Sequence, residues 1–181
     1  MTLLQIADSG FATGGYAFSH GIEGLVVGGI VRDAPDLTGL LRVQIKEGLT
    51  VVELPAMRHA YRYAVAGDLD AIVALDELLT ALKPVPSARA ASAKVGRRLL
   101  VSAAGLMPDP AMNGYLAAID NGWAGGHYAA ASGVVFAAIG TDEETAALTL
   151  GAISLQGWAA AAVRLGTVGQ AAAQGVAAAL H

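Results

Sequence analysis

A few histidine, serine and carboxylate side chains are the groups in this chain that could perform chemistry. His20 and Glu23 lie three residues apart, a spacing that can place both on one helix face, as in carboxylate-bridged metal bundles. Such sites need matching contributions from neighbouring helices, and the sequence offers only this one. The lack of further pairs of this kind therefore favours a structural role for Glu23, as a cap or an ion-pair partner. A helical metal- or ligand-binding protein using His20 and Glu23 is kept as an alternative.

No familiar nucleophilic or nucleotide-binding motif accompanies these two residues. Ser9, Ser19 and Ser92 belong to no recognisable set of nucleophile, base and orienting carboxylate, and the chain has no cysteine. Thr13-Gly14-Gly15 lacks the lysine of a phosphate-binding loop, so this chain is not expected to hydrolyse a nucleotide. We therefore expect no catalytic residues, no metal ligands and no cofactor.

Arg164 is the only cation after Arg98 and follows an uncharged stretch, residues 145–163. Residues 166–170 after it read as a turn. A guanidinium in these surroundings either pairs with one internal carboxylate or reaches a carboxylate or phosphate of a partner. The residues alone leave both possibilities open.

The composition indicates an apolar, mildly acidic single domain. The 181 residues are 55% hydrophobic with a formal charge of −4, so no basic stripe is available for nucleic acid. Asp8 interrupts the first apolar run, which argues against a secretion signal, and the lack of cysteine fits the cytoplasm. Residues 121–141 and 145–163 are uncharged, but their small residues insert weakly into bilayers. A small helical membrane protein is therefore the less favoured alternative.

Charge is distributed unevenly along the chain. Of the 11 basic and 15 acidic residues, only five follow residue 110. Because soluble helices are usually solvated by charged side chains, the second half is expected to be packed centrally or covered by another protein. The five are Asp120, Asp142, Glu143, Glu144 and Arg164.

Hydrophobic periodicity predicts an all-α fold, a single-domain bundle of roughly eight helices over residues 1–181. No segment shows the period-two alternation of a strand bounded by hairpin turns. The expected helices are 21–31, a block from Asp36 to Ala66 punctuated at Gly48 and Pro55, 68–82, one from Ala88, 111–125, 127–139, one from Asp142, and 170–180.

Capping residues mark the expected helix ends. Gly67 and Gly140 read as stops, because glycine adopts the left-handed conformation that ends a helix. The expected amino-terminal caps are Asp36, Asp68, Asp109 and His127. Thr141-Asp142-Glu143-Glu144 reads as a capping box. Placing the carboxylates at a helix start explains this acidic cluster without a metal.

The helix expected from Ala88 carries almost only positive charge. Arg89, Lys94, Arg97 and Arg98 occupy its polar positions. This pattern suits an acidic partner surface, although a solvated helix face is the commoner explanation.

The amino-terminal segment 3–23 is the most distinctive part of the chain. It reads L-Q-hydrophobic-A-D-S, then T-G-G-aromatic, then S-x-G-hydrophobic-E. This order resembles the signature of the UreF family of urease accessory proteins. Further matches follow in family order: Glu47-Gly48, Leu54-Pro55, Arg89-x-x-Ser92 with Gly96, Val163-Arg164-Leu165 and Gly169-Gln170.

Two features depart from the family pattern. Ala12 stands where the family usually has proline before Thr-Gly-Gly. The family also usually continues for some tens of residues beyond the position of Gln170, in a tail that meets partner proteins, whereas this sequence ends at His181. By resemblance, binding to the accessory protein UreD is expected to be weakened or lost.

The resemblance implies a non-catalytic, helical, typically dimeric protein of the cytoplasm. In the family, UreF bridges the UreD (UreH) accessory protein and the nickel-carrying GTPase UreG, has a regulatory effect on the GTPase, and docks on apo-urease during nickel insertion. Nickel is then handled by the complex. The resemblance and the pattern together make Tyr16, Ser19, Glu23, Arg164 and Gln170 the expected partner-binding residues.

Overall fold

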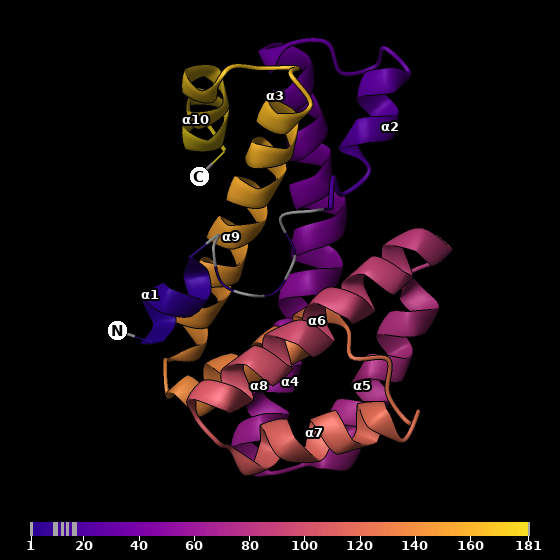
Figure 1. Ribbon diagram of the computed structural model, residues 1–181, viewed down its shortest axis with the longest axis vertical. Coiled ribbons are helices and arrows are strands. Elements are labelled where there is room, and N and C mark those ends of the chain that lie inside the picture. The colour runs from indigo at the N-terminus through magenta and orange to yellow at the C-terminus, as the bar shows by residue number, and fades with distance from the viewer. Residues whose placement is uncertain (1, 9–10, 12, 14, 16–17, 181) are drawn as a thin grey trace.

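The computed structural model describes residues 2–8, 11, 13, 15 and 18–180. Within these ranges the chain forms helices and no strand, as the sequence predicts (Figure 1). The elements are α1 (Thr2–Ala7), α2 (Ile22–Val27), α3 (Ala34–Val43), the π-helical η2 (Gln44–Glu53), α4 (Leu54–Ala66), α5 (Leu69–Leu82), α6 (Pro86–Leu106), α7 (Pro110–Asp120), α8 (Tyr128–Ile139), α9 (Glu143–Arg164) and α10 (Gln170–Ala178).

Helix α8 forms the centre of the fold. All residues from Ala129 to Phe136 are buried, and the helix packs against α1, α4, α5, α6, α7 and α9. A helix that is enclosed on all sides has no solvated face to carry charge. Central packing therefore explains the lack of charge in residues 129–136, one of the two explanations expected from the sequence.

Two glycines allow helix backbones to touch at this centre. A Cβ atom on Gly133 of α8 would lie 2.8 Å from the Ala60 Cβ and 2.8 Å from the Tyr61 amide nitrogen on α4. A Cβ atom on Gly96 of α6 would lie 2.8 Å from the Tyr128 amide nitrogen. No side chain fits at such distances, so α8 is positioned directly by the backbones of its neighbours.

A second apolar cluster joins α2, α3, α9 and α10. Its buried residues include Ile22, Leu37, Leu41 and Trp158. In Figure 1 it occupies the upper half of the view, and α9 and the α3–η2–α4 rod run from it toward the α8 centre. These two rods set the distance between the two ends of the molecule.

Helix α9 is the one helix, among the residues described, whose length and apolarity would allow it to cross a bilayer. Its most apolar window has a mean hydropathy of 1.4, and 39% of that window is buried. Core helices share this composition, and α9 packs against six other helices, α1, α2, α3, α4, α8 and α10.

The predicted interruption of the block 36–66 is wrong. Helices α3, η2 and α4 follow one another directly, with Gly48 inside η2 and Pro55 in the first turn of α4. Proline lacks an N–H group, and its ring would clash with the carbonyl four residues earlier in a regular α-helix. The wider π-helical turns before Pro55 accommodate the ring without ending the helix.

Two predicted caps are displaced along the chain. Asp33 caps α3 by accepting from the Asp36 amide at 3.0 Å, and Asp36 lies in the first turn instead. Asp142 caps α9 by accepting from the Thr145 amide at 2.9 Å, so Thr141 is not the capping residue. In both places two neighbouring residues had side chains able to cap. The helices are capped by Asp33 and by Asp142, whereas the prediction named Asp36 and Thr141.

The caps with a single candidate are confirmed. Asp68 and Asp109 accept from amides of the turns that they begin. Gly67 and Gly140 end their helices with φ values of 72° and 76°. These positive φ values are the conformation that favours glycine.

Two helices are shorter than predicted. Helix α2 ends at Val27 instead of residue 31, because Gly29 adopts a φ of 71°, and Ile30 is exposed. Helix α7 ends at Asp120 instead of residue 125, because Gly122 adopts a φ of 75° and its amide bonds to the Ile119 carbonyl. Residues 121–127 therefore form a turn.

Replacing Gly133 by alanine is expected to lower the free energy of unfolding by about 2 kcal/mol, because the new methyl group would overlap the α4 backbone. Gly151→Ala in α9 is the matched control, since nothing lies within 4 Å of its Cβ position. That variant should be neutral or slightly more stable. Urea unfolding measures both, and equal midpoints for the two variants would contradict the proposed close contact.

Candidate functional site

The loop of residues 18–20 is held between two distant parts of the chain. The Arg164 Nη2, at the end of α9, donates to the Phe18 carbonyl at 3.4 Å. The Gln44 Nε2, at the start of η2, donates to the His20 carbonyl at 3.3 Å. Two side chains thus hold the backbone of a loop that has no regular secondary structure.

The backbone of His20 is unusual. Among the described residues it is the one non-glycine with a positive φ, 52°, and it precedes Gly21, which has a φ of 84°. His20 therefore lies in a turn before α2, whereas Glu23 lies within the first turn of α2 and is exposed. The expectation that His20 and Glu23 share a helix face is wrong, and the metal site suggested by their spacing loses its geometric basis.

Electrostatics favour the neutral form of His20. Partial withdrawal of the ring from water lowers its pKa below the usual value, and the positive charge of Arg164 lowers it further. Glu53 acts in the opposite direction. The loop thus presents a neutral imidazole beside an exposed guanidinium.

The predicted partner-binding residues lie around one end of α9. Arg164 is exposed on its last turn, and Ser19 is half-buried in the adjoining loop. Glu23 on α2 and Gln170 at the start of α10 are exposed on helices that both pack against α9. Tyr16 lies outside the described residues. The Arg164 side chain donates to a backbone carbonyl of the loop 18–20, a contact that the sequence did not predict.

A buried carboxylate that sequence reasoning missed organises the other end of the molecule. Asp76 of α5 is fully buried and accepts from the Tyr115 hydroxyl at 2.7 Å. Its other donors are the amides of His127 at 2.7 Å, Gly126 at 2.9 Å and Gly125. The available signal was its place in the apolar stripe of α5, four residues after Ile72.

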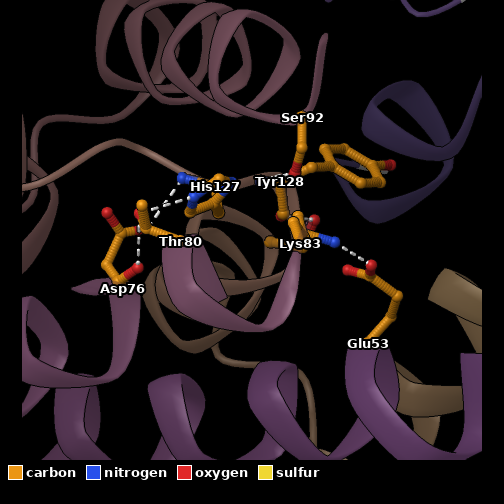
Figure 2. Close-up of polar contacts among 8 residues, drawn as sticks. Glu53, Asp76, Thr80, Lys83, Ser92, His127 and Tyr128 are labelled. Carbon is orange, nitrogen blue, oxygen red and sulfur yellow. Dashed lines mark hydrogen bonds and ion pairs between the residues drawn. The ribbon is translucent and has the colours of Figure 1, made fainter. Parts of the chain in front are cut away.

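His127 lies beside this carboxylate in Figure 2. Its Nε2 is 3.0 Å from the Thr80 Oγ1, and its Nδ1 is buried without a hydrogen-bond partner among the described residues. His127 occupies the cap position of α8, but its side chain makes no capping bond. The prediction of a capping role is therefore right in position and wrong in mechanism.

The ring of His127 is held neutral. Burial lowers its pKa most, and the positive charges of Lys83 and Arg89 add to this effect. Asp76 and Glu53 oppose it. Lys83 and Glu53 form an ion pair next to this cluster, as Figure 2 shows.

The bonding of Asp76 suits a structural clamp. Burial and the Asp76 charge raise the Tyr115 pKa, so the phenol stays protonated and donates to the carboxylate. Three amides and one hydroxyl fill the acceptor positions of a carboxylate that would otherwise act as a base. No group of three or more His, Cys, Asp or Glu residues able to hold a metal occurs in the described part of the chain.

The acidic cluster 142–144 is also explained by its contacts. Asp142 caps α9, and Glu143 accepts from the Arg62 Nε at 2.7 Å, with the Arg58 Nη1 at 3.5 Å. These arginines lower the pKa of Glu143, Arg62 more strongly than Arg58. The pairs link α4 to the first turn of α9.

Asp76→Asn should lower the free energy of unfolding by about 3 kcal/mol, because a neutral amide cannot accept all four bonds and its NH₂ group would face other donors. Asp70→Asn on the same helix is the control, since Asp70 is exposed. Chemical denaturation compares the two. A loss no larger than that of Asp70→Asn would show that the clamp does not stabilise the fold.

His127→Gln should flatten the pH dependence of stability in mild acid. The folded pKa of His127 is below about 6.5, so the unfolded chain binds this proton first and stability falls as pH drops below about 6.5. Removing the ring removes that part of the slope. His59→Gln, at an exposed position, is the control. Thermal unfolding from pH 7.5 to 5.5 measures the slope, and identical slopes for both variants would refute the assignment.

Comparisons with known proteins agree with the resemblance seen in the sequence. The UreF family model matches residues 31–181. The urease accessory protein UreF of Methylobacterium radiotolerans is 32% identical over 99% of this chain and 77% of its own length. That of Trichodesmium erythraeum is 29% identical over 96% of this chain and 75% of its own length. The chain therefore belongs to the UreF family of urease accessory proteins.

Proposed function

We propose that this protein is a non-catalytic scaffold of urease maturation. In this role it bridges the UreD (UreH) accessory protein and the GTPase UreG while nickel is inserted into apo-urease. The observation that carries the proposal is the family membership, because the relatives that match nearly the whole chain are named urease accessory proteins. An accessory role requires binding surfaces and does not require a catalytic site of its own.

The end of α9 is the surface that we assign to the GTPase. Arg164 is exposed there, and its bond to the Phe18 carbonyl keeps it beside the loop 18–20. A guanidinium offers a planar set of donors that suits a carboxylate or phosphate better than a lysine does. Ser19, Glu23 and Gln170 belong to the proposed contact. Tyr16, which lies outside the described residues, is proposed as a further contact residue.

The proposal extends to the setting of the complex. The assembled proteins carry the nickel, and this chain binds no cofactor of its own. The chain acts as a homodimer in the cytoplasm. The apolar composition of the chain supports an assembling protein, because Val27, Leu148 and other large apolar side chains are exposed. Light scattering and nickel analysis of the purified complex test these parts. A complex that contains a single copy of this chain, or nickel bound to this chain alone, would contradict them.

Arg164→Glu should weaken binding to UreG at least tenfold, because it reverses the charge of a central contact residue. Arg164→Lys should retain part of the affinity, since it keeps the charge and loses the planar fork. Arg42→Glu, exposed on α3, makes the same charge change elsewhere. Calorimetry with purified UreG measures the three constants.

Unchanged affinity in Arg164→Glu would remove Arg164 from the interface without affecting the family assignment. Failure of the unmodified protein to bind UreD or UreG would contradict the scaffold itself. Circular dichroism of each variant checks that the loss of the Phe18 contact has not unfolded the chain.

A further inference from the structure

Trp123 is an exposed indole on a rigid support. Its side chain is 70% exposed, which is unusual for the residue type that buries the largest apolar area. It lies in the turn 121–127, where its own amide bonds to the Ala118 carbonyl at 2.9 Å. The proposed function assigns no role to this residue.

The Asp76 clamp fixes the turn that carries Trp123. Gly125, Gly126 and His127 all donate their amides to the buried carboxylate. The conformation of the turn is therefore set before any partner arrives. A backbone fixed in this way loses little conformational entropy on binding, which lowers the cost of using this turn as a contact.

A positively charged helix face adjoins the turn. Arg97 of α6 pairs with Asp120, at the end of α7, at 2.8 Å. A Cβ atom on Gly126 would lie 3.7 Å from the Arg97 Cβ, so α6 and the turn are in contact. Lys94, Arg98 and Val101 are exposed on the same helix, which has no acidic residue along its length.

We propose that Trp123 and the exposed α6 residues Lys94, Arg97, Arg98 and Val101 form a binding surface, the α6–Trp123 surface, for an acidic region of a partner protein. The indole enters an apolar recess of that partner, and the cations meet its carboxylates. The argument is charge complementarity: a chain with a formal charge of −4 displays here a helix face that carries only cations.

The chemistry of the surface favours a protein over a nucleic acid. Its exposed Trp123 and Val101 offer apolar contacts, which a phosphate backbone would not use. The Arg97–Asp120 pair is exposed on both sides, 49% and 58%, so it contributes little to stability and Arg97 is able to exchange partners. Aromatic residues and arginine are both enriched in protein interfaces.

The α6–Trp123 surface lies away from Arg164. In Figure 1, α10 and the end of α9 occupy the top of the view, whereas α6 and α7 lie in its lower half. A protein that bridges two others needs two surfaces that do not overlap. The inference rests on the proposed scaffold role for the identity of its partner: because the end of α9 is assigned to UreG, the α6–Trp123 surface is assigned to UreD (UreH).

The test measures binding kinetics of the full chain to UreD (UreH), UreG and apo-urease separately, by biolayer interferometry. Trp123→Ala should weaken binding to UreD (UreH) at least tenfold, mainly through faster dissociation, and leave binding to UreG unchanged. The double variant Lys94→Glu, Arg98→Glu should slow association with the same protein and reduce its salt dependence. Val65→Ala, at a residue that is 67% exposed, and Arg42→Glu are the matched controls and should bind like the unmodified chain.

The outcomes separate this inference from the proposed function. Unchanged binding of Trp123→Ala to UreD (UreH), with binding to UreG still weakened in Arg164→Glu, would overturn the α6–Trp123 surface and leave the scaffold role intact. No binding of the unmodified chain to any of the three would overturn both. A change of oligomeric state in Trp123→Ala, seen by light scattering, would assign the surface to a second copy and overturn the acidic partner.

Discussion

The structure depends on direct backbone contact between α8 and its two neighbours. At Gly133 and Gly96 there is no room for a Cβ atom, so the spacing of α4, α8 and α6 is set by main-chain atoms. Side chains in a helical core usually adjust to small shifts, whereas backbones in contact cannot. This constraint accounts for the small residues of α8, because a larger side chain would separate helices that must touch. The lack of charge in residues 129–136 is a result of this packing.

The buried carboxylate of Asp76 follows from the same geometry. When Gly126 is pressed against Gly96 of α6, the amides of the turn 125–127 point into the protein and have no access to a helical partner. A carboxylate satisfies them, and the cost of burying its charge is offset because every acceptor position is filled. The clamp therefore joins α5 to the start of α8, and through Tyr115 to α7.

Sequence reasoning succeeded where one residue determines a local structure and failed where distant residues act together. Gly67 and Asp109 mark their helix ends alone, and both were predicted. The donors to Asp76 lie 39 to 51 residues away, and Phe18 and Arg164 are 146 apart. Hydrophobic periodicity gives no information on contacts between residues that lie so far apart in the sequence. Only the apolar stripe around Asp76 gave a local sign that a charge would be buried.

The arrangement of the two apolar clusters bears on how a bridging protein would work. Helix α9 and the α3–η2–α4 rod belong to both clusters, so the surface around Arg164 and the surface around Trp123 are attached to one continuous framework. A partner at one end cannot shift that end independently without disturbing the backbone contacts of α8. The framework would therefore hold two bound proteins at a fixed separation and orientation. For the transfer of an ion between proteins, a fixed geometry of this kind is more useful than a flexible linker, because it raises the effective concentration of one site at the other.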